Sequence, residues 1–181
     1  MRRSAILLAM ALASTVVLLP GLTALPSKLV WNASPSVPIG FYRITSDRVF
    51  SAGDLVAARP PEPLATFLAD RAYLPKGVLL LKRILAVSGA TVCREGLRIA
   101  VDGVEVGTAL ERDHAGRELP HWQGCRPIPV GTVFLMNRSV RDSLDGRYFG
   151  LISTDRIIGR AVPLWTDEQG NGRFEWRARA R

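Results

Sequence analysis

The sequence predicts a mainly β domain with one short helix, preceded by an N-terminal transmembrane helix. Two observations support a β domain: short apolar runs recur along the chain, and Gly and Pro residues interrupt them at turn-like intervals. A third limits the helices, because only residues 64–74 carry apolar side chains at convincing three- and four-residue spacing. At 181 residues, the chain has the length of one domain and an anchor.

Residues 1–27 are the predicted membrane anchor. The run from Ser4 to Leu25 is 22 residues long and almost wholly apolar, and about 20 apolar residues are needed to span a bilayer. Arg2 and Arg3 favour a cytoplasmic N-terminus. The alternative is a cleaved secretory signal, whose apolar region usually has about 7–15 residues. Because no good small-x-small cleavage site follows, the uncleaved anchor is favoured, and in both cases the rest of the chain is exported.

Residues 28–165 form the predicted exported domain. The run at 78–87 is nearly all apolar, which is typical of a strand buried on both faces, and Asp102-Gly103 indicates the tight turn of a hairpin. Polar residues 111–129 are expected to form an irregular loop, and the polar tail 166–181 is expected to be poorly ordered. Strands are expected, in chain order, at residues 41–44, 54–58, 78–87, 90–93, 97–101, 104–106, 132–136 and 157–164.

The few cysteines and histidines argue against the usual metal sites. Cys93 and Cys125 are 32 positions apart, and the chain has only two histidines, so no zinc-ligand spacing is present. We therefore expect neither a metal nor another cofactor. Export to an oxidising compartment allows a disulfide between Cys93 and Cys125. Two separate thiols fit the sequence equally well, because spacing alone does not bring two Cβ atoms within bonding distance.

The net charge of +8 favours anionic partners, of which phospholipid head groups and nucleic acid are the two main classes. The basic residues are scattered, however, and no basic stripe interleaved with aromatic residues occurs. An ordinary solvated basic surface is therefore favoured. We expect a membrane partner and no nucleic acid.

Ser36 and Lys82 are the candidate catalytic pair. A serine hydroxyl is a weak nucleophile and needs a base. His114 and His121 lie in the polar excursion and are expected to be surface residues. Lys82 interrupts an apolar run, so packing of its strand should lower the pKa of its amine toward the range of catalytic lysines, about 7–8. The alternative is a lysine at the edge of the sheet with its tip in solvent, and Arg83 next to it is expected to be solvated.

Residues 141–150 form a polar loop that can support such a pair. Ser143 is able to hydrogen-bond the lysine amine and orient its lone pair, and Asp145 is able to pair with Arg147 and fix the loop. The alternative is an Asp-Gly turn with ordinary surface charges, which is a common feature of proteins.

These three segments together resemble the sequence boxes of the type I signal peptidase family. The boxes are Ser36-Val-Pro-Ile-Gly-Phe-Tyr, Lys82 in Leu-Lys-Arg-Ile-Leu-Ala-Val, and Ser143-Leu-Asp-Gly-Arg-Tyr-Phe-Gly. The likeness is greater to the conjugative-transfer branch, of the TraF type, because the first box has the form Asn-x-x-x-Ser-x-Pro-x-Gly-x-Tyr from Asn32 onward. Asn137-Arg138 matches the family's asparagine–arginine element, although the register of this match is not fixed by the sequence.

The resemblance implies a signal-peptidase-like β domain on the periplasmic side of the inner membrane. It implies that Ser36 is the nucleophile, Lys82 the general base, and Ser143 the residue that orients the lysine. Ser34 matches a position whose hydroxyl helps to hold the oxyanion, and Asp145 and Arg147 match structural positions of the third box.

It also implies the substrate, a precursor polypeptide such as the pilin precursor of a conjugation system. In that branch, cleavage can be coupled to closure of the peptide into a ring. The alternatives are a general housekeeping signal peptidase, a non-catalytic assembly factor of a secretion or conjugation apparatus, and a membrane-tethered DNA-contacting protein.

Overall fold

The computed structural model describes residues 6–8, 10, 12–15 and 29–176. The predicted anchor at 1–27 therefore falls mostly outside the described residues. Within them, no helix combines the length and the apolar character needed to cross a bilayer. The expected periplasmic orientation depends on this anchor, so it stays a prediction.

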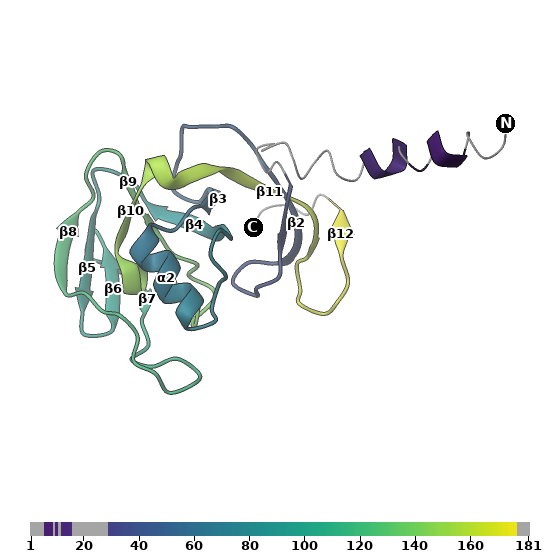
Figure 1. The fold of residues 1–181 in the computed structure, drawn as a ribbon. Helices are drawn as coiled ribbons and strands as arrows, with labels where there is room; N and C mark the ends of the chain where they lie inside the picture. Colours follow the sequence, from purple (N-terminus) through teal and green to yellow (C-terminus); the bar gives the residue numbers. More distant parts are fainter. Residues whose placement is uncertain (1–5, 9, 11, 16–28, 177–181) are drawn as a thin grey trace.

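The strands of the described chain form two antiparallel sheets (Figure 1). The larger has the order β1-β2-β11-β3-β4-β9-β10, with β12 added to β11, and the smaller has the order β7-β6-β5-β8. The strands of the larger sheet are β1 Leu29–Asn32, β2 Ile39–Ile44, β3 Leu55–Ala58, β4 Leu80–Ala86, β9 Thr132–Leu135, β10 Leu151–Ser153, β11 Ile157–Asp167 and β12 Glu175–Trp176. Those of the smaller sheet are β5 Thr91–Glu95, β6 Arg98–Val101, β7 Val104–Thr108 and β8 Gly124–Pro127.

The predicted strands are all present, and the structure adds four that were not predicted. The turn Asp102-Gly103 has φ angles of 48° and 78°, as a tight hairpin turn of this type requires, and it joins β6 to β7. Strands β1, β8, β10 and β12 were not predicted. All four residues of β8 are exposed, so its sequence carries no alternation of apolar and polar residues.

The predicted helix is present as α2, Glu62–Asp70. It begins after Pro61, has Pro63 in its first turn, where the missing N–H breaks no helical hydrogen bond, and buries Leu64, Ala65 and Leu68. It ends before residue 74 because Ala72 has φ 57°, outside the helical range. The expectation of a single helix is wrong: α3, Gly146–Phe149, and a 3₁₀ turn, Thr154–Arg156, are too short to show a helical period in the sequence.

Strand β4 lies inside the larger sheet, between β3 and β9, and is buried on both faces, as its sequence predicts. Leu81 packs in one cluster with Val37 and Tyr42, whereas Ile84 packs in another with Val133. Pairing with β3 places Lys82 opposite Val56, which is fully buried. An interior strand of the larger sheet therefore carries a buried lysine.

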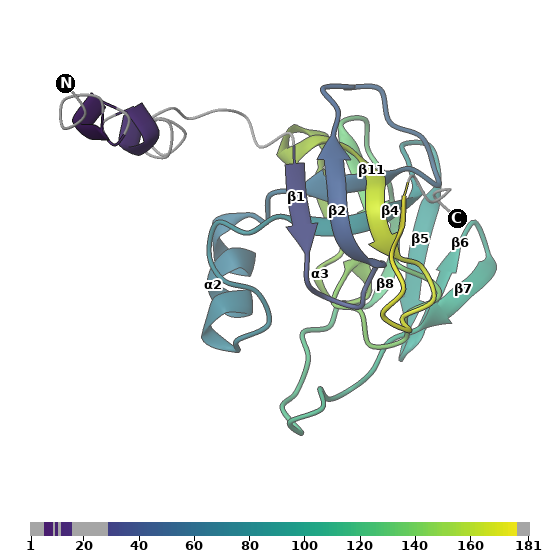
Figure 2. The ribbon, with the colours of Figure 1, turned by 90° about the vertical axis from the view of Figure 1, so that its right-hand side faces the viewer.

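The prediction of a poorly ordered C-terminal tail is wrong for residues 166–176. Strand β11 continues to Asp167, the chain turns, and β12 pairs back onto β11, as Figure 2 shows. Thr166 is completely buried. Aromatic contacts hold the turn: the Trp165 ring lies 4.5 Å from Phe174 and 6.4 Å from Trp176, measured between centroids. Two aromatic residues in an otherwise polar segment were the signal that the prediction overlooked.

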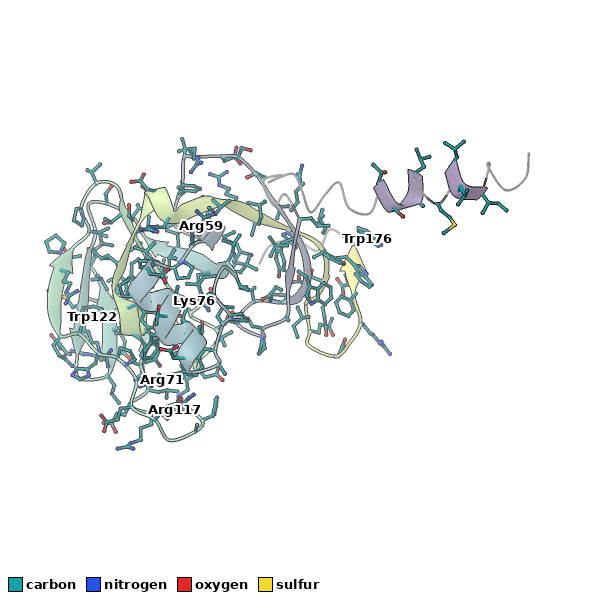
Figure 3. The ribbon with its side chains drawn as sticks, viewed as in Figure 1. Arg59, Arg71, Lys76, Arg117, Trp122 and Trp176 are labelled. Carbon is teal, nitrogen blue, oxygen red and sulfur yellow. A yellow bond between two sulfur atoms is a disulfide. The ribbon has the colours of Figure 1, made fainter. Side chains whose placement is uncertain are left out.

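The smaller sheet contains a disulfide. Cys93 on β5 and Cys125 on β8 lie opposite each other in the strand register, and their sulfur atoms are bonded. The spacing in the sequence did not select this arrangement, because β8 was not predicted. Figure 3 shows the side chains on this framework, with Trp122 close to the smaller sheet.

Candidate functional site

Asn32 shapes the loop between β1 and β2 that carries Ser36. Its side-chain amide donates to the backbone carbonyls of Ser34, Val37 and Pro38 at 2.7, 3.0 and 3.1 Å. The Tyr42 hydroxyl also donates to the Pro38 carbonyl, at 2.6 Å. The loop is thus closed around a buried polar side chain, and it holds the hydroxyl oxygens of Ser34 and Ser36 3.0 Å apart.

Lys82 is buried, with only 5% of its surface exposed. Its Nζ donates to the Ser143 hydroxyl at 2.8 Å, and it forms no ion pair with a carboxylate in the described chain. Desolvation lowers the pKa of the amine from 10.5 to about 8, although the charge of Asp145 acts in the opposite direction. The amine is therefore not the solvent-exposed tip that the alternative interpretation required.

A buried ion pair fixes the loop that carries Ser143. Arg147 Nε donates to Asp145 Oδ1 at 2.9 Å, and Nη2 donates to Oδ2 at 2.9 Å. The same guanidinium donates to the backbone carbonyls of Val140, Arg141 and Ser143 at 2.7, 2.9 and 3.0 Å. Because both side chains are buried and fully engaged, the segment is not an ordinary surface turn.

Two residues in or next to the smaller sheet, Arg94 and Trp122, support this loop by hydrogen bonds to its backbone. Arg94 of β5 is buried and donates to the backbone carbonyl of Arg147 at 2.5 Å. The Trp122 indole donates to the carbonyl of Gly146 at 3.0 Å. Neither Arg94 nor Trp122 was predicted as a site residue. Their contacts depend on how the two sheets meet, which no local pattern in the sequence encodes.

Asn137 is the site residue whose place the sequence left undecided. Its amide nitrogen donates to the Ser36 carbonyl at 2.7 Å, and its side-chain oxygen accepts from the backbone N–H of Arg83 at 2.9 Å. Its own N–H donates to Asp145 Oδ2 at 3.1 Å. An uncharged polar residue directly after an apolar strand was the available signal. Asn137 joins the loop of Ser36, the strand of Lys82 and the buried ion pair.

No hydrogen bond connects Ser36 to Lys82 in the described chain. The Ser36 hydroxyl lies against Ser34, and the Lys82 amine lies against Ser143. The fold brings the two segments together through Asn137, which contacts the backbone on both sides of Lys82: it accepts from Arg83 N–H and donates to the Leu81 carbonyl at 3.5 Å.

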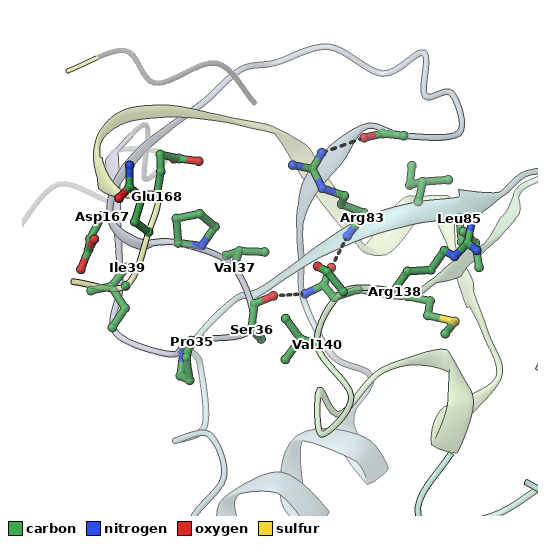
Figure 4. Close-up of a pocket in the computed structure, with 18 residues that line it drawn as sticks. Pro35, Ser36, Val37, Ile39, Arg83, Leu85, Arg138, Val140, Asp167 and Glu168 are labelled. Atoms are coloured by element: carbon green, nitrogen blue, oxygen red, sulfur yellow. Dashed lines mark hydrogen bonds between the residues drawn. The ribbon is translucent and has the colours of Figure 1, made fainter. Parts of the chain in front are cut away.

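A cavity of about 560 Å³ opens beside Ser36 (Figure 4). The loop of Ser36 forms one wall, and β4 contributes Arg83 and Leu85. The C-terminal turn, with Asp167 and Glu168, closes another side. Arg83 was expected to be solvated, but it is half-buried and its guanidinium donates to the Gly53 carbonyl at 3.1 Å. A space bounded by extended backbone and largely apolar side chains suits an extended polypeptide.

The histidines lie at the surface, although His114 contacts the loop that carries Ser143. His114 is exposed and contacts Asp142, with Nε2 2.9 Å from Oδ2, and His121 is exposed as well. The Asp142 partner was not predicted. No cluster of three or more His, Cys, Asp or Glu side chains able to hold a metal ion occurs among the described residues.

Comparison with known proteins identifies relatives of the chain. The family model described as "Signal peptidase, peptidase S26" matches residues 1–165. A "Conjugal transfer protein TraF" of Agrobacterium fabrum is 34% identical over 147 residues, covering 75% of this chain and 81% of its own. A "Plasmid transfer protein TraF" of Escherichia coli is 31% identical over 147 residues, covering 74% and 82%.

Among solved structures, a signal peptidase I from Enterococcus faecalis V583 aligns with a TM-score of 0.37 at 19% sequence identity. The alignment covers 62% of this chain and 96% of that one. Assignment to a family rests on the sequence matches alone.

Proposed function

The chain belongs to the signal peptidase family S26, and on that premise we propose that it is a membrane-bound serine endopeptidase in which Ser36 is the nucleophile and Lys82 the general base. The observation that carries the proposal is the Lys82 amine, which is buried, hydrogen-bonded to Ser143, and without an ion pair to any carboxylate of the described residues. A lysine in this environment is neutral often enough near neutral pH to accept a proton from a hydroxyl.

The proposed reaction begins with rotation of the Ser36 side chain away from Ser34 toward Lys82. Hydrogen bonds of catalytic groups are often long or misaligned before substrate binds, so the resting contact with Ser34 is compatible with this step. Lys82 accepts the hydroxyl proton as Ser36 Oγ attacks the scissile carbonyl carbon. Ser34 Oγ and the backbone N–H of Ser36 then donate to the developing oxyanion.

The tetrahedral intermediate collapses to an acyl-enzyme. The Lys82 ammonium gives its proton to the leaving amine, which departs with the C-terminal part of the substrate. The now neutral Lys82 takes a proton from an incoming water as that water attacks the acyl carbonyl carbon. The bond between Ser36 Oγ and the acyl group then breaks, Lys82 returns the proton to Ser36 Oγ, and the N-terminal product leaves with a new carboxylate. An amine positioned in place of that water would give an amide, and so a ring if the amine belongs to the same peptide.

The proposed substrate is an exported precursor polypeptide, in particular a pilin precursor of a conjugative transfer system. This proposal is supported by the printed names of two relatives, a conjugal and a plasmid transfer protein. The proposed location is the inner membrane, with the catalytic domain in the periplasm and its anchor among the phospholipids. A general housekeeping signal peptidase is the second candidate.

The decisive experiment measures precursor cleavage by the full-length protein in detergent. Ser36→Ala and Lys82→Ala should each abolish cleavage, and Lys82→Arg should fail as well because a guanidinium stays protonated. Lys76→Ala and Ser88→Ala are the matched controls, since both residues are exposed and lie outside the site. Normal cleavage by a folded Lys82→Ala variant would remove the mechanism.

A second experiment separates the two candidate functions. The wild-type protein is given a pilin precursor and a generic secreted precursor at equal concentration. Preferential cleavage of the pilin precursor supports the conjugative role, whereas equal cleavage of both favours a housekeeping enzyme. A non-catalytic assembly factor would cleave neither, and its role would tolerate Ser36→Ala.

A further inference from the structure

The cavity beside Ser36 carries opposite charges on its two sides. Arg83 and Arg138 lie on one side of Ser36, and Asp167 and Glu168 lie on the other (Figure 4). The two arginines come from different elements, β4 and the segment after β9, and the hydrogen bonds of Asn137 hold these elements together. An extended substrate in the cavity would therefore have arginine side chains near one end and carboxylates near the other.

The two arginines are held in place but have unused donors. Arg83 Nη1 donates to the Gly53 carbonyl at 3.1 Å, and Arg138 Nε donates to the Val106 carbonyl at 3.1 Å. No other hydrogen bond of either guanidinium, and no ion pair with a carboxylate, involves a described residue. Arg147 and Arg160 differ, because each has a carboxylate partner within the protein, Asp145 and Asp54 respectively.

The two carboxylates on the acidic side of the cavity already accept hydrogen bonds from the protein itself. The two oxygens of Asp167 accept the backbone N–H groups of Asn171 and Gly172 at 3.1 and 2.7 Å. Glu168 accepts from the Thr166 hydroxyl at 2.7 Å. These carboxylates shape the C-terminal turn. The hydrogen-bonding groups that remain for a substrate are therefore the N–H donors of the two arginines on the cationic side of the cavity.

We propose that the cationic side of the cavity, to which Arg83 and Arg138 contribute, binds a carboxylate of the substrate close to the scissile bond. This inference rests on the proposed function and adds the substrate class: polypeptides with an acidic group near the cut. A guanidinium presents parallel N–H donors that fit a carboxylate, and the partial burial of Arg83 strengthens the attraction there. The carboxylate comes from an Asp or Glu side chain or from a nearby chain terminus.

The test measures peptide binding to the full-length Ser36→Ala variant, so that cleavage does not interfere. One peptide series carries a single Glu at each successive position around the cut, with Gln at the same position as its partner and an amidated C-terminus. A second pair differs only in having a free or an amidated C-terminus. We expect one Glu position, or the free terminus, to bind up to about fivefold tighter than its neutral partner, with the preference shrinking as salt is added.

Substitution of the arginines tests whether they form the proposed carboxylate site. Arg83→Gln together with Arg138→Gln should remove the acid preference. Arg138→Glu, at an exposed position, should reverse it toward a Lys-containing peptide even if changes at half-buried Arg83 disturb folding. Arg43→Gln is the matched control, because Arg43 is exposed on β2 and does not line the cavity.

Each result is decisive. Equal binding of acidic and neutral peptides throughout the series, or an acid preference that survives the double substitution, overturns the proposal. Cleavage by the wild-type protein is measured in parallel with neutral peptides. If that cleavage is absent or independent of Ser36 while the acid preference follows the two arginines, the proposed peptidase activity is wrong and the carboxylate site stands.

Discussion

The side-chain amide of Asn137 donates to the backbone carbonyl of Ser36 at 2.7 Å. The same side chain accepts from the N–H of Arg83, the residue after Lys82, and the backbone N–H of Asn137 donates to the buried carboxylate of Asp145. One residue thereby sets the position of the Ser36 loop relative to the strand of Lys82. In the described chain, this connection takes the place of a direct hydrogen bond between serine and lysine.

Asn137→Ala should lower kcat more than it raises KM. Loss of the amide frees the Ser36 loop, and a displacement of about 1 Å can cost on the order of a hundredfold in rate. The variant should also lose about 1–3 kcal/mol of stability, because the N–H of Arg83 loses its acceptor. Asn171→Ala, in the exposed C-terminal turn, is the control.

The measurement for Asn137 is the rate at which Ser36 is acylated by an activated ester, taken well below the melting temperature of the variant. A purely structural role would leave that rate unchanged in the folded protein. An unchanged rate would therefore refute the positioning role.

The pH dependence of cleavage should follow the Lys82 amine. Burial lowers the pKa of this amine to about 8, and the neutral form is the base, so kcat/KM should rise about tenfold per pH unit below pH 8 and level off above it. The profile is measured from about pH 6 to pH 10 with one peptide. Activity that falls as the pH rises through 8 would show that the protonated amine is the active form.

The same burial predicts how stability depends on pH. The pKa of Lys82 is lower in the folded protein than its ordinary value of 10.5. Between about pH 8 and 10.5, the unfolded chain therefore binds more protons, so the free energy of unfolding rises with pH across this window. Lys82→Met should remove this rise and stabilise the protein at pH 7 by about 1–3 kcal/mol.

Urea unfolding at pH 7 and at pH 10 measures this effect of Lys82. The control is Lys76→Met, since Lys76 is an exposed residue paired with Glu62. The explanation fails if Lys82→Met lowers stability at pH 7 while Lys76→Met leaves it unchanged.

How far the sequence predicts the site depends on whether a signal is local. The buried position of Lys82 follows from the apolar residues around it, which any strand in that register would pack. Asn137 and Arg94 depend on contacts between elements that are distant in the sequence. The polar loop at 141–150 suggested a contact between Ser143 and the lysine, but an ordinary surface turn fitted the same residues, because the hydrogen bond to Lys82 spans 61 positions.

The fold shows the same division. Strands with continuous apolar runs, such as β4, are evident from composition, and the β6–β7 hairpin is evident from its turn. Strand β8 is fully exposed and is stabilised by pairing with β5, to which a disulfide also joins it. Pairing between distant strands leaves no periodic trace in an exposed strand, so such elements are found only in the folded chain.

Arg147→Lys should destabilise the protein strongly. A lysine cannot reproduce the paired donors to Asp145, and it leaves the carbonyls of the Ser143 loop without partners. Disrupting a buried ion pair costs about 3–5 kcal/mol. The matched control is Arg160→Lys, because its pair with Asp54 is partly exposed and should be worth less than about 1 kcal/mol. If both variants lost the same free energy of unfolding in urea, burial would not determine how much each ion pair stabilises the protein.

Gly40→Ala tests why the C-terminal turn is ordered. A Cβ at Gly40 would lie 2.1 Å from the Trp165 carbonyl oxygen, and the residue has φ +145°, so β2 and β11 are able to pair closely here only without a side chain. The substitution should separate the strands, release Thr166 from its buried position and cost more than about 3 kcal/mol.

Gly89→Ala is the control, since its φ of +96° brings backbone strain but no atom lies within 4 Å, and it should cost about 1 kcal/mol. Urea unfolding compares the two, and proteolysis after residue 167 reports on the turn. If Gly40→Ala costs no more than Gly89→Ala and the turn resists protease, the close approach of the two strands is not what holds the C-terminal segment against the cavity.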